Sequence, residues 1–280
     1  MKIKEAANKR IAAFAEALIL NGNSRPTGEL YAGVDLGTAY IVTAVVDSQG
    51  TPVAGVLTRS ESSVRDGLVL DYVGAIAILR RQLQRLRQAG LAVGLAKAAY
   101  PPGTTGRNAS AFGNVLTAVG LEVQGLIDEP TAAALVLEIT DGAVVDIGGG
   151  TTGISVLENG AVIYTADEPT GGVHLDLVLA GHFRMELAEA ERLKRDSSRQ
   201  TELFPLLRPV FQKMATIVRQ HLQGHQVETI YLVGGTSSFP GIEGVMEEET
   251  GLPVVRPTSP LLVTPLGIAL SCLQSAGRAE

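Results

Sequence analysis

Two stretches of the chain repeat one pattern of apolar and polar positions. Residues 33–57 read GVDLGTAYIVTAVVDSQGTPVAGVL, and residues 143–167 read AVVDIGGGTTGISVLENGAVIYTAD. In each copy an apolar strand ends in an aspartate, a Gly/Thr turn follows, and two further strands are joined by a glycine-containing turn. In the second copy that turn is Asn-Gly, a strong short-range signal for a hairpin. Two copies of one strand meander, separated by helical sequence, predict two related α/β halves.

Helical periodicity marks the segments around these copies. A helix is expected over 72–88, where the apolar residues Tyr72, Ile76, Leu79, Leu83 and Leu86 share one face. The opposite side carries Arg80, Arg81, Arg85 and Arg87. A solvated face is favoured over a basic binding patch there, because the chain as a whole is acidic. The other expected elements are a strand within 91–102, strand-to-helix units at 121–137 and 228–249, and helices near 110–119, 175–195, 206–222 and 261–273.

The N-terminal segment differs from a signal peptide. Charges interrupt residues 1–20, while Ile11, Phe14 and Leu18 follow helical spacing, so an amphipathic helix is expected, followed by a turn-rich linker up to residue 29. This helix either packs on its own first lobe, which is the favoured reading, or docks on a partner protein. No apolar run reaches the roughly 18 residues that a membrane span needs.

Composition narrows the partners and the compartment. A net charge of -6 disfavours nucleic acid and anionic membranes, and the absence of Trp with only 4% aromatic residues removes platforms for stacking bases. The single cysteine, Cys272, excludes an intramolecular disulfide and a cysteine metal cluster, and in an apolar C-terminal helix it is expected to be a packing thiol. A reducing, cytoplasmic location is the natural interpretation.

The glycine turns carry the candidate chemistry. Asp35–Leu36–Gly37–Thr38 and the run 146–152 each expose backbone N–H groups after a strand, where several can converge on one phosphate. An aspartate would repel that phosphate unless a cation lies between them, so the two-aspartate pattern implies Mg²⁺ held through its waters. The turns at 170–172 and 233–241 also follow strands, where ligands of open α/β sheets bind. The alternative for each turn taken singly is a tight connection without a ligand.

Other chemistries find weaker support. His221 and His225 have the spacing of helical metal ligands, but Gly224 interrupts the helix and no third zinc ligand is evident. The chain has no Walker A lysine motif and no Gly-x-Ser-x-Gly nucleophile turn. In DEPTAAA at 128–134, Glu129 precedes a proline at a helix start, either as an acid stabilised by the helix dipole or as a carboxylate that holds a water.

Taken in order, these motifs resemble those of the superfamily that contains actin, DnaK-type chaperones and sugar kinases. GVDLGTAY resembles its first phosphate loop, VVDIGGGTTGISV its second, and DEPTAAAL its connecting segment. The fragments AERLK at 190–194 and LVGGTSSFPGIE at 232–243 resemble the adenosine-binding segments. The resemblance covers nearly everything after Tyr31. It implies an α/β fold of the actin-like ATPase type, with two related lobes, each a mixed sheet flanked by helices, around a nucleotide cleft.

The resemblance also implies roles for single residues. Asp35 and Asp146 would hold Mg²⁺ through waters, and Glu129 would position the metal or an attacking water. The residues implied to contact ATP or ADP are Gly37, Thr38, Ala39, Gly148, Gly149, Gly150, Thr151, Thr152, Gly171, Gly172, Glu191, Lys194, Ser198, Gly234 and Gly235. The implied domain limits are an N-terminal helix and linker at 1–29, a first lobe of 30–142 plus 261–280, and a second lobe of 143–260.

The chain also departs from the pattern of DnaK-type chaperones. No lysine occurs between Asp35 and Lys97, so their phosphate-facing lysine has no match by motif. Ser238 stands where they stack an arginine on adenine, and Leu261 or Leu262 replaces an acid near the base. The resemblance therefore implies nucleotide binding and leaves hydrolysis open, at most as a slow ATPase.

The short, insertion-free chain, with PPGT at 101–104 and VTPLGIAL at 263–270, most resembles the chaperone-like branch of ethanolamine utilisation. This implies a client such as an ethanolamine-degrading enzyme or a microcompartment shell protein, and possible association with the microcompartment. The alternatives are an assembly or filament protein of the MreB or FtsA kind, and a sugar kinase. A sugar kinase would need an additional acid that no motif supplies.

Overall fold

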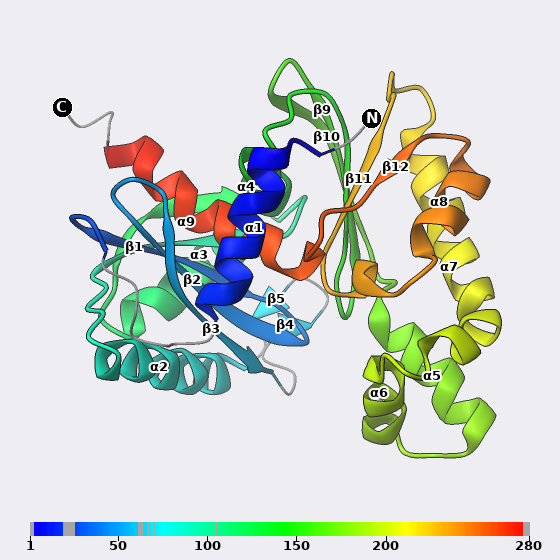
Figure 1. Ribbon diagram of the computed structural model, residues 1–280, viewed down its shortest axis with the longest axis horizontal. Coiled ribbons are helices and arrows are strands. Elements are labelled where there is room, and N and C mark those ends of the chain that lie inside the picture. The colour runs from blue at the N-terminus through cyan, green and yellow to red at the C-terminus, as the bar shows by residue number, and fades with distance from the viewer. Residues whose placement is uncertain are drawn as a thin grey trace.

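Each copy of the repeated strand pattern forms the antiparallel part of a five-stranded sheet (Figure 1). The computed structural model describes residues 3–18, 26–60, 64–65, 68–69, 71–104 and 106–276. The strands of the first sheet are β1 (Leu30–Leu36), β2 (Tyr40–Asp47), β3 (Pro52–Arg59), β6 (Leu95–Tyr100) and β7 (Glu122–Asp128). Those of the second are β8 (Gly142–Ile147), β9 (Thr152–Glu158), β10 (Ala161–Glu168), β11 (Ile230–Val233) and β12 (Val254–Val255).

The two sheets have the same topology. Their orders are β3-β2-β1-β6-β7 and β10-β9-β8-β11-β12. In each, three antiparallel strands are followed by two strands parallel to the first. The predicted pair of related mixed sheets is therefore confirmed, although the two-residue β12 was not foreseen. A small hairpin of β4 (Val64–Arg65) and β5 (Leu68–Val69) stands apart from both sheets.

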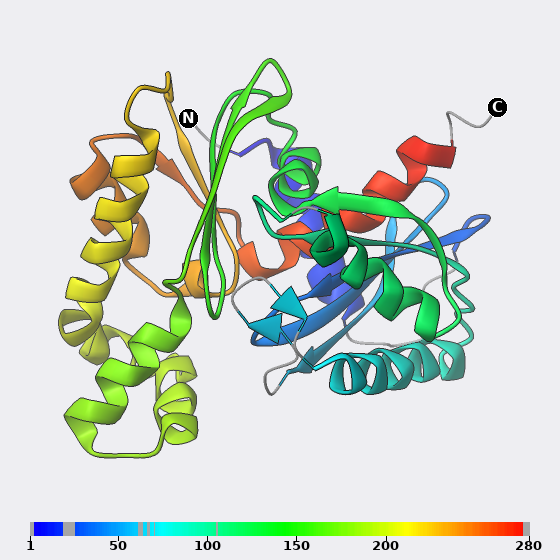
Figure 2. The same ribbon diagram turned by 180° about the vertical axis from the view of Figure 1, so that it is seen from behind.

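Helices cover the faces of both sheets (Figures 1 and 2). They are α1 (Glu5–Ala17), α2 (Tyr72–Gln88), α3 (Gly106–Ala118), α4 (Glu129–Leu137), α5 (Gly172–Phe183), α6 (Leu187–Arg195), α7 (Gln200–Leu222), α8 (Ile242–Thr250) and α9 (Val263–Ala276), with 3₁₀ turns η1 (Thr236–Ser238) and η2 (Pro260–Leu262). On the first sheet, α2 and α3 pack on one face, and α1 and α9 pack on the other. Strands buried on both faces explain why their sequences are apolar runs rather than alternating patterns.

Helix α7 begins earlier than the sequence suggested. The helix was expected near 206–222. Prolines remove backbone donors, and both Pro205 and Pro209 lie in this region. The helix instead runs from Gln200 and contains both prolines. Its buried stripe already includes Leu203 and Leu207, and burying this apolar stripe against the second sheet outweighs the lost hydrogen bonds.

The N-terminal helix uses its apolar face inside the molecule. Ala7, Ile11 and Phe14 are fully buried, and Phe14 lies on β3, where a Cβ on Gly55 would come within 2.6 Å of its ring. On the polar side of α1, Lys4 and Arg10 pair with Glu138 at the end of α4. The contacts of α1 are thus with its own chain. Residues 19–25 of the expected linker lie outside the described residues, and the domain limits stay a prediction.

Helices α4 and α9 pack closely against each other. A Cβ added at Gly267 would lie 1.9 Å from the carbonyl oxygen of Ala132, so only glycine permits this approach.

In helix α9, Cys272 is buried, and burial raises the pKa of its thiol to about 11. Within the described part of the chain, no helix combines the length and apolar character needed to cross a bilayer.

Candidate functional site

The glycine turn after β8 lies directly against the turn after β1. A Cβ added at Gly149 would lie 2.9 Å from the Cβ of Ala39, and one at Gly150 would lie 3.2 Å from the hydroxyl oxygen of Thr38. The glycines after these strands permit this close approach. Side chains at these positions would fill the space between the two halves and keep the turns apart.

A cavity of about 360 Å³ opens beside these turns. This volume lies in the range of small-molecule sites. Of the residues predicted to form a site, those that line the cavity are Asp35, Gly37, Thr38, Ala39, Glu129, Asp146, Gly148, Gly149, Gly150, Thr151, Glu191, Lys194, Gly234 and Gly235. Ser238 and Leu261 line it as well. The fold thus brings together motifs that are spread over more than two thirds of the chain.

Besides Glu191, which pairs with Arg59, three carboxylates line this cavity. Burial and the nearby charge of Asp146 raise the pKa of Asp35 to about 7. Burial also raises the pKa of Asp146 to about 6. The hydrogen bond from the Thr264 hydroxyl lowers this pKa, and the charge of Asp167 raises it. Burial, followed by the charges of Asp146 and Asp35, raises the pKa of Glu129 well above its ordinary value. Like charges held in one enclosed site favour a bound cation, which would restore their ionised forms.

The donor set fits Mg²⁺ held through water better than a directly ligated metal. Among the described residues, no three acidic, histidine or cysteine side chains are arranged to hold one metal ion. Mg²⁺ prefers oxygen ligands and usually keeps several of its waters, so two carboxylates beside a cavity suit it. The same arrangement would suit a magnesium ion that is also bound by the phosphates of a ligand.

Asp146 is held in place by the C-terminal part of the chain. The hydroxyl of Thr264 donates to its Oδ2 at 3.1 Å. On the other side, Gly234 has a φ of 88°, and a Cβ there would lie 2.2 Å from Asp146 Oδ1. Substitution of Gly234 would therefore displace the carboxylate. Thr264 lies within VTPLGIAL at 263–270, but no role at the site was predicted for it from the sequence alone.

Helix α6 lines the cavity with Glu191, Lys194 and Arg195, and it also contacts the first sheet. Glu191 pairs with Arg59 at the end of β3, and the guanidinium of Arg195 lies over the ring of Tyr40, 5.3 Å from its centre. Lys194 pairs with Asp176 at 2.7 Å, and its ammonium also donates to the carbonyl of Gly172 at 2.9 Å. Both contacts from α6 to the first sheet thus lie at the cavity.

Four predicted site residues do not line the cavity. Thr152 is buried and its hydroxyl donates to the carbonyl of Thr170 at 2.6 Å. Gly171 and Gly172 lie behind the second glycine turn, and the Gly172 amide donates to the carbonyl of Gly148 at 3.0 Å. The exposed Ser198 hydroxyl donates to Asp196. Contact of these four residues with a nucleotide stays a prediction.

Lys97 and His221 form hydrogen bonds with other groups of the protein. Lys97 donates to the carbonyl of Ser271 at 2.9 Å and does not line the cavity. His221 lies between the Tyr164 hydroxyl at 2.6 Å and Glu168 at 2.8 Å, so its two nitrogens are engaged without a metal.

The cavity is also lined by residues for which no role was predicted from the sequence, although most of them lie within or next to the motifs. They are Tyr40, Pro101, Arg195, Gln200, Thr236, Phe239 and Thr264. The available signal was their place in the motifs: Tyr40 ends GVDLGTAY at 33–40, Thr236 and Phe239 lie in LVGGTSSFPGIE at 232–243, and Arg195 follows Lys194.

Comparison with known proteins identifies the family. The ethanolamine utilization protein EutJ of Escherichia coli (strain K12) is 44% identical over 249 residues, which cover 88% of this chain and 87% of that protein. The chain belongs to the EutJ family. A crystal structure of EutJ from Carboxydothermus hydrogenoformans superposes with a TM-score of 0.89 at 45% identity, covering 94% of this chain and 98% of the other. The family predicted from the motifs is confirmed.

More distant similarities agree on the fold of this EutJ-family chain. Family models match residues 138–261 (type IV pilus assembly protein PilM) and residues 58–190 (MreB/Mbl protein). MreB5 of Spiroplasma citri bound to AMPPNP superposes with a TM-score of 0.74 at 18% identity, covering 91% of this chain and all of that one. The same MreB5 has also been solved with ADP. The actin-like fold class predicted from the sequence is therefore confirmed.

Proposed function

We propose that this EutJ-family chain binds ATP or ADP together with Mg²⁺ in the cavity between its two sheets. The observation that carries the proposal is the meeting of two glycine turns, one from each repeat, beside Asp35, Glu129 and Asp146. Distant relatives of the same fold have been solved with ADP and with AMPPNP, which supports an adenine nucleotide as the ligand.

The backbone would supply most of the phosphate contacts. Amides of Gly37, Thr38 and Ala39 on one side, and those of residues 148–151 on the other, can converge on one polyphosphate. Asp35 and Asp146 would hold Mg²⁺ through waters, and the ion would offset the charge of the phosphates. Glu191 and Lys194 of α6 would face the sugar and base, above Gly234 and Gly235.

Hydrolysis is expected to be slow. Efficient phosphoryl transfer places positive charge against the developing negative charge of the phosphates. Lys97 is engaged by a backbone carbonyl away from the cavity, and Lys194 is held by Asp176. Glu129 can hold a water, but its raised pKa favours the protonated form over the carboxylate, which a bound cation would counteract.

Calorimetric titration of ATP and ADP, with and without Mg²⁺, tests the site. Binding should depend on Mg²⁺ in the native chain and be lost in Asp146→Ala. Asp141→Ala is the matched control, because Asp141 is an exposed aspartate that does not line the cavity. Phosphate release measured in parallel separates a slow ATPase from a nucleotide sensor. Absence of binding to the native chain would refute the proposal.

The biological output proposed here is that of a chaperone-like protein of ethanolamine utilisation. Nucleotide between the sheets would draw the lobes together. Closure would change the surface offered to an ethanolamine-degrading enzyme or to a shell protein of a microcompartment. Such closure would change the contacts of α6 with Arg59 and Tyr40 of the first lobe. Binding of purified candidate clients that is the same with and without ATP would count against this output.

An assembly function is the second candidate, because the chain shares its fold with MreB5 and with the MreB/Mbl family model. Polymerisation predicts that ATP and Mg²⁺ shift the protein into the pellet on sedimentation. A protein that stays in the supernatant with every nucleotide would remove this candidate.

A further inference from the structure

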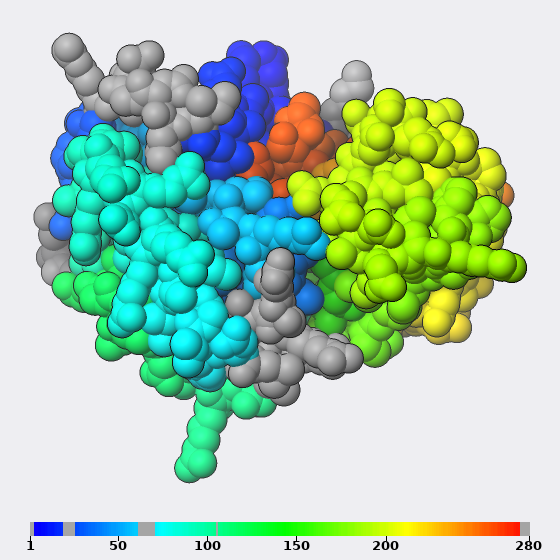
Figure 3. Space-filling model, turned by 90° about the horizontal axis from the view of Figure 1, so that it is seen from below, coloured from blue at the N-terminus to red at the C-terminus, as the bar shows by residue number. Residues whose placement is uncertain are grey.

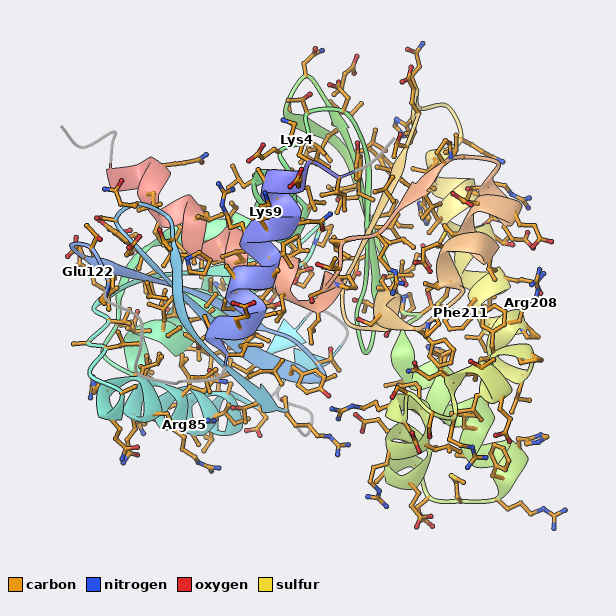
Figure 4. All side chains as sticks on the ribbon, viewed as in Figure 1. Lys4, Lys9, Arg85, Glu122, Arg208 and Phe211 are labelled. Atoms are coloured by element: carbon orange, nitrogen blue, oxygen red, sulfur yellow. The ribbon has the colours of Figure 1, made fainter. Side chains whose placement is uncertain are left out.

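Among the described residues, one helix of the first lobe presents four arginines to solvent that form no ion pair. Arg80, Arg81, Arg85 and Arg87, called here the arginine face, are exposed on the side of α2 opposite the buried Leu79, Leu83 and Leu86. Figure 4 shows Arg85 on this outer side, and Figure 3 shows that α2 lies at the surface of the first lobe. The arginine face is therefore accessible to another molecule.

The charged residues in the chain segment that carries the arginine face are all basic. Residues 72–121 contain no aspartate or glutamate, although the chain as a whole has a net charge of -6. Among the described residues, none of the four arginines is paired with a carboxylate, and the one hydrogen bond they make is from Arg80 to the carbonyl of Ala118 at 3.1 Å. Cations elsewhere that do form ion pairs include Lys4, Arg10, Arg59, Lys194, Arg199, Arg208 and Arg256.

This arrangement does not serve the stability of the helix as a whole. Arg81 and Arg85 are four residues apart, so their like charges repel across one turn. Arg85 and Arg87 lie in the last turn, where the helix dipole favours cations, but that explanation does not reach Arg80 and Arg81. Exposed glutamates on α2 would relieve the repulsion, and none is present.

The helix that carries the arginine face is firmly attached to the sheet. Gln82 is buried among apolar side chains, and its carboxamide makes three hydrogen bonds. Its Oε1 accepts from the Thr43 hydroxyl at 2.7 Å, and its Nε2 donates to the Ile41 carbonyl at 2.8 Å and the Thr58 hydroxyl at 2.9 Å. A fully satisfied buried amide fixes the rotation and register of α2. The guanidinium groups are therefore presented from a rigid support, which lowers the entropic cost of binding.

An exposed apolar residue continues the same side of α2. Val73 is 79% exposed and lies two helical turns before Arg80, on the same side. An apolar contact beside arginines is the composition that distinguishes protein interfaces, in which arginine is enriched and lysine depleted.

We propose that the arginine face of α2, with Val73, binds an acidic surface of a partner protein. The guanidinium fork matches carboxylates in a bidentate way, and the face contains arginine but no lysine. The overall negative charge and the lack of exposed aromatic residues on α2 disfavour nucleic acid and anionic lipid. The proposal is independent of nucleotide binding, because no residue of the arginine face lines the cavity.

A labelled acidic polymer provides a direct test with the whole protein. The probe is a short fluorescein-labelled poly-L-glutamate, and binding is followed by fluorescence anisotropy at low and at physiological salt. The Arg81→Gln/Arg85→Gln double variant is expected to weaken binding on the order of tenfold. The Arg184→Gln/Lys213→Gln variant, which removes two exposed cations of the second lobe, should bind like the native chain. Thermal unfolding establishes that both variants are folded.

The outcomes discriminate between the possible occupants. Salt-dependent binding that is lost in the α2 variant alone supports the proposal. Equal binding by native and α2-variant proteins, or no binding at low salt, overturns it. Tighter binding to phosphatidylglycerol vesicles or to a DNA duplex would also overturn it, in favour of a membrane or nucleic acid. Salt-dependent self-association on sedimentation, abolished by the α2 variant, would identify a second copy of this chain as the occupant and overturn a different protein partner.

Discussion

Replacing Asp35 by asparagine should stabilise the ligand-free protein and weaken binding of Mg²⁺ with nucleotide. The folded protein raises the pKa of Asp35 from 3.8 to about 7, first by burial and then by the charge of Asp146. A shift of about three pKa units corresponds to about 4 kcal/mol of destabilisation when the carboxylate is ionised. Because the carboxylate faces the cavity, solvent screens part of this cost, and a gain of about 2 kcal/mol is expected near pH 8.

The gain should depend on pH in a definite direction. A raised pKa means that the folded protein binds a proton between pH 3.8 and about 7 that the unfolded chain has released. The cost of the native carboxylate is therefore fully present above the folded pKa and shrinks as the pH falls toward 3.8. The advantage of Asp35→Asn should be largest near pH 8, fall to roughly half near pH 5, and nearly vanish near pH 4.

Urea unfolding without Mg²⁺ or nucleotide measures this dependence, with Asp47→Asn as the control. Asp47 accepts hydrogen bonds from the amides of Thr27, Gln49 and Thr51. Although burial opposes them, these bonds lower the pKa of Asp47 overall. Its substitution should therefore destabilise the protein near pH 8, and this loss should shrink in acid. Destabilisation by Asp35→Asn near pH 8, or a gain that is the same at every pH, would refute the reasoning.

Three further predictions follow from packing and charge. Gln82→Leu leaves its buried partners without hydrogen bonds and should cost about 2–4 kcal/mol in chemical unfolding, whereas Gln84→Leu on the exposed side should change stability little; equal effects would contradict the anchoring role. Gly267→Ala should destabilise the protein by about 3 kcal/mol or more, while Gly181→Ala, with open space at its Cβ, should stabilise by up to about 1 kcal/mol in the same assay. A neutral Gly267→Ala would show that the α4–α9 crossing can relax. Affinity for Mg²⁺ with ATP should fall as the pH drops through about 7 to about 6, since the cavity carboxylates then take up protons; calorimetry at several pH values would expose a flat profile, which excludes these groups as the ion's partners.

Secondary structure was predictable wherever residues close together in the sequence determine it. The strand meanders and the helix Tyr72–Gln88 formed where expected, because alternation, apolar runs and turn residues act over a few positions. The Asn159–Gly160 turn has positive φ at both residues, as the hairpin rule requires. The start of α7 was expected too late, because the burial of Leu203 and Leu207 against the second sheet, which favours the longer helix, cannot be read from the local sequence.

By itself, the sequence determined that two related halves exist and which glycine turns and aspartates belong to them. The repeat is visible in the sequence, since both copies form the same strand meander from the same pattern of apolar and turn residues. Only the tertiary structure decided that Thr264 holds Asp146, that Arg195 covers Tyr40, and that Gly171 and Gly172 lie behind a turn rather than in the cavity. Thr264 and Asp146 are 118 residues apart, and no local pattern encodes which side chains meet when two separately folded sheets close around one space.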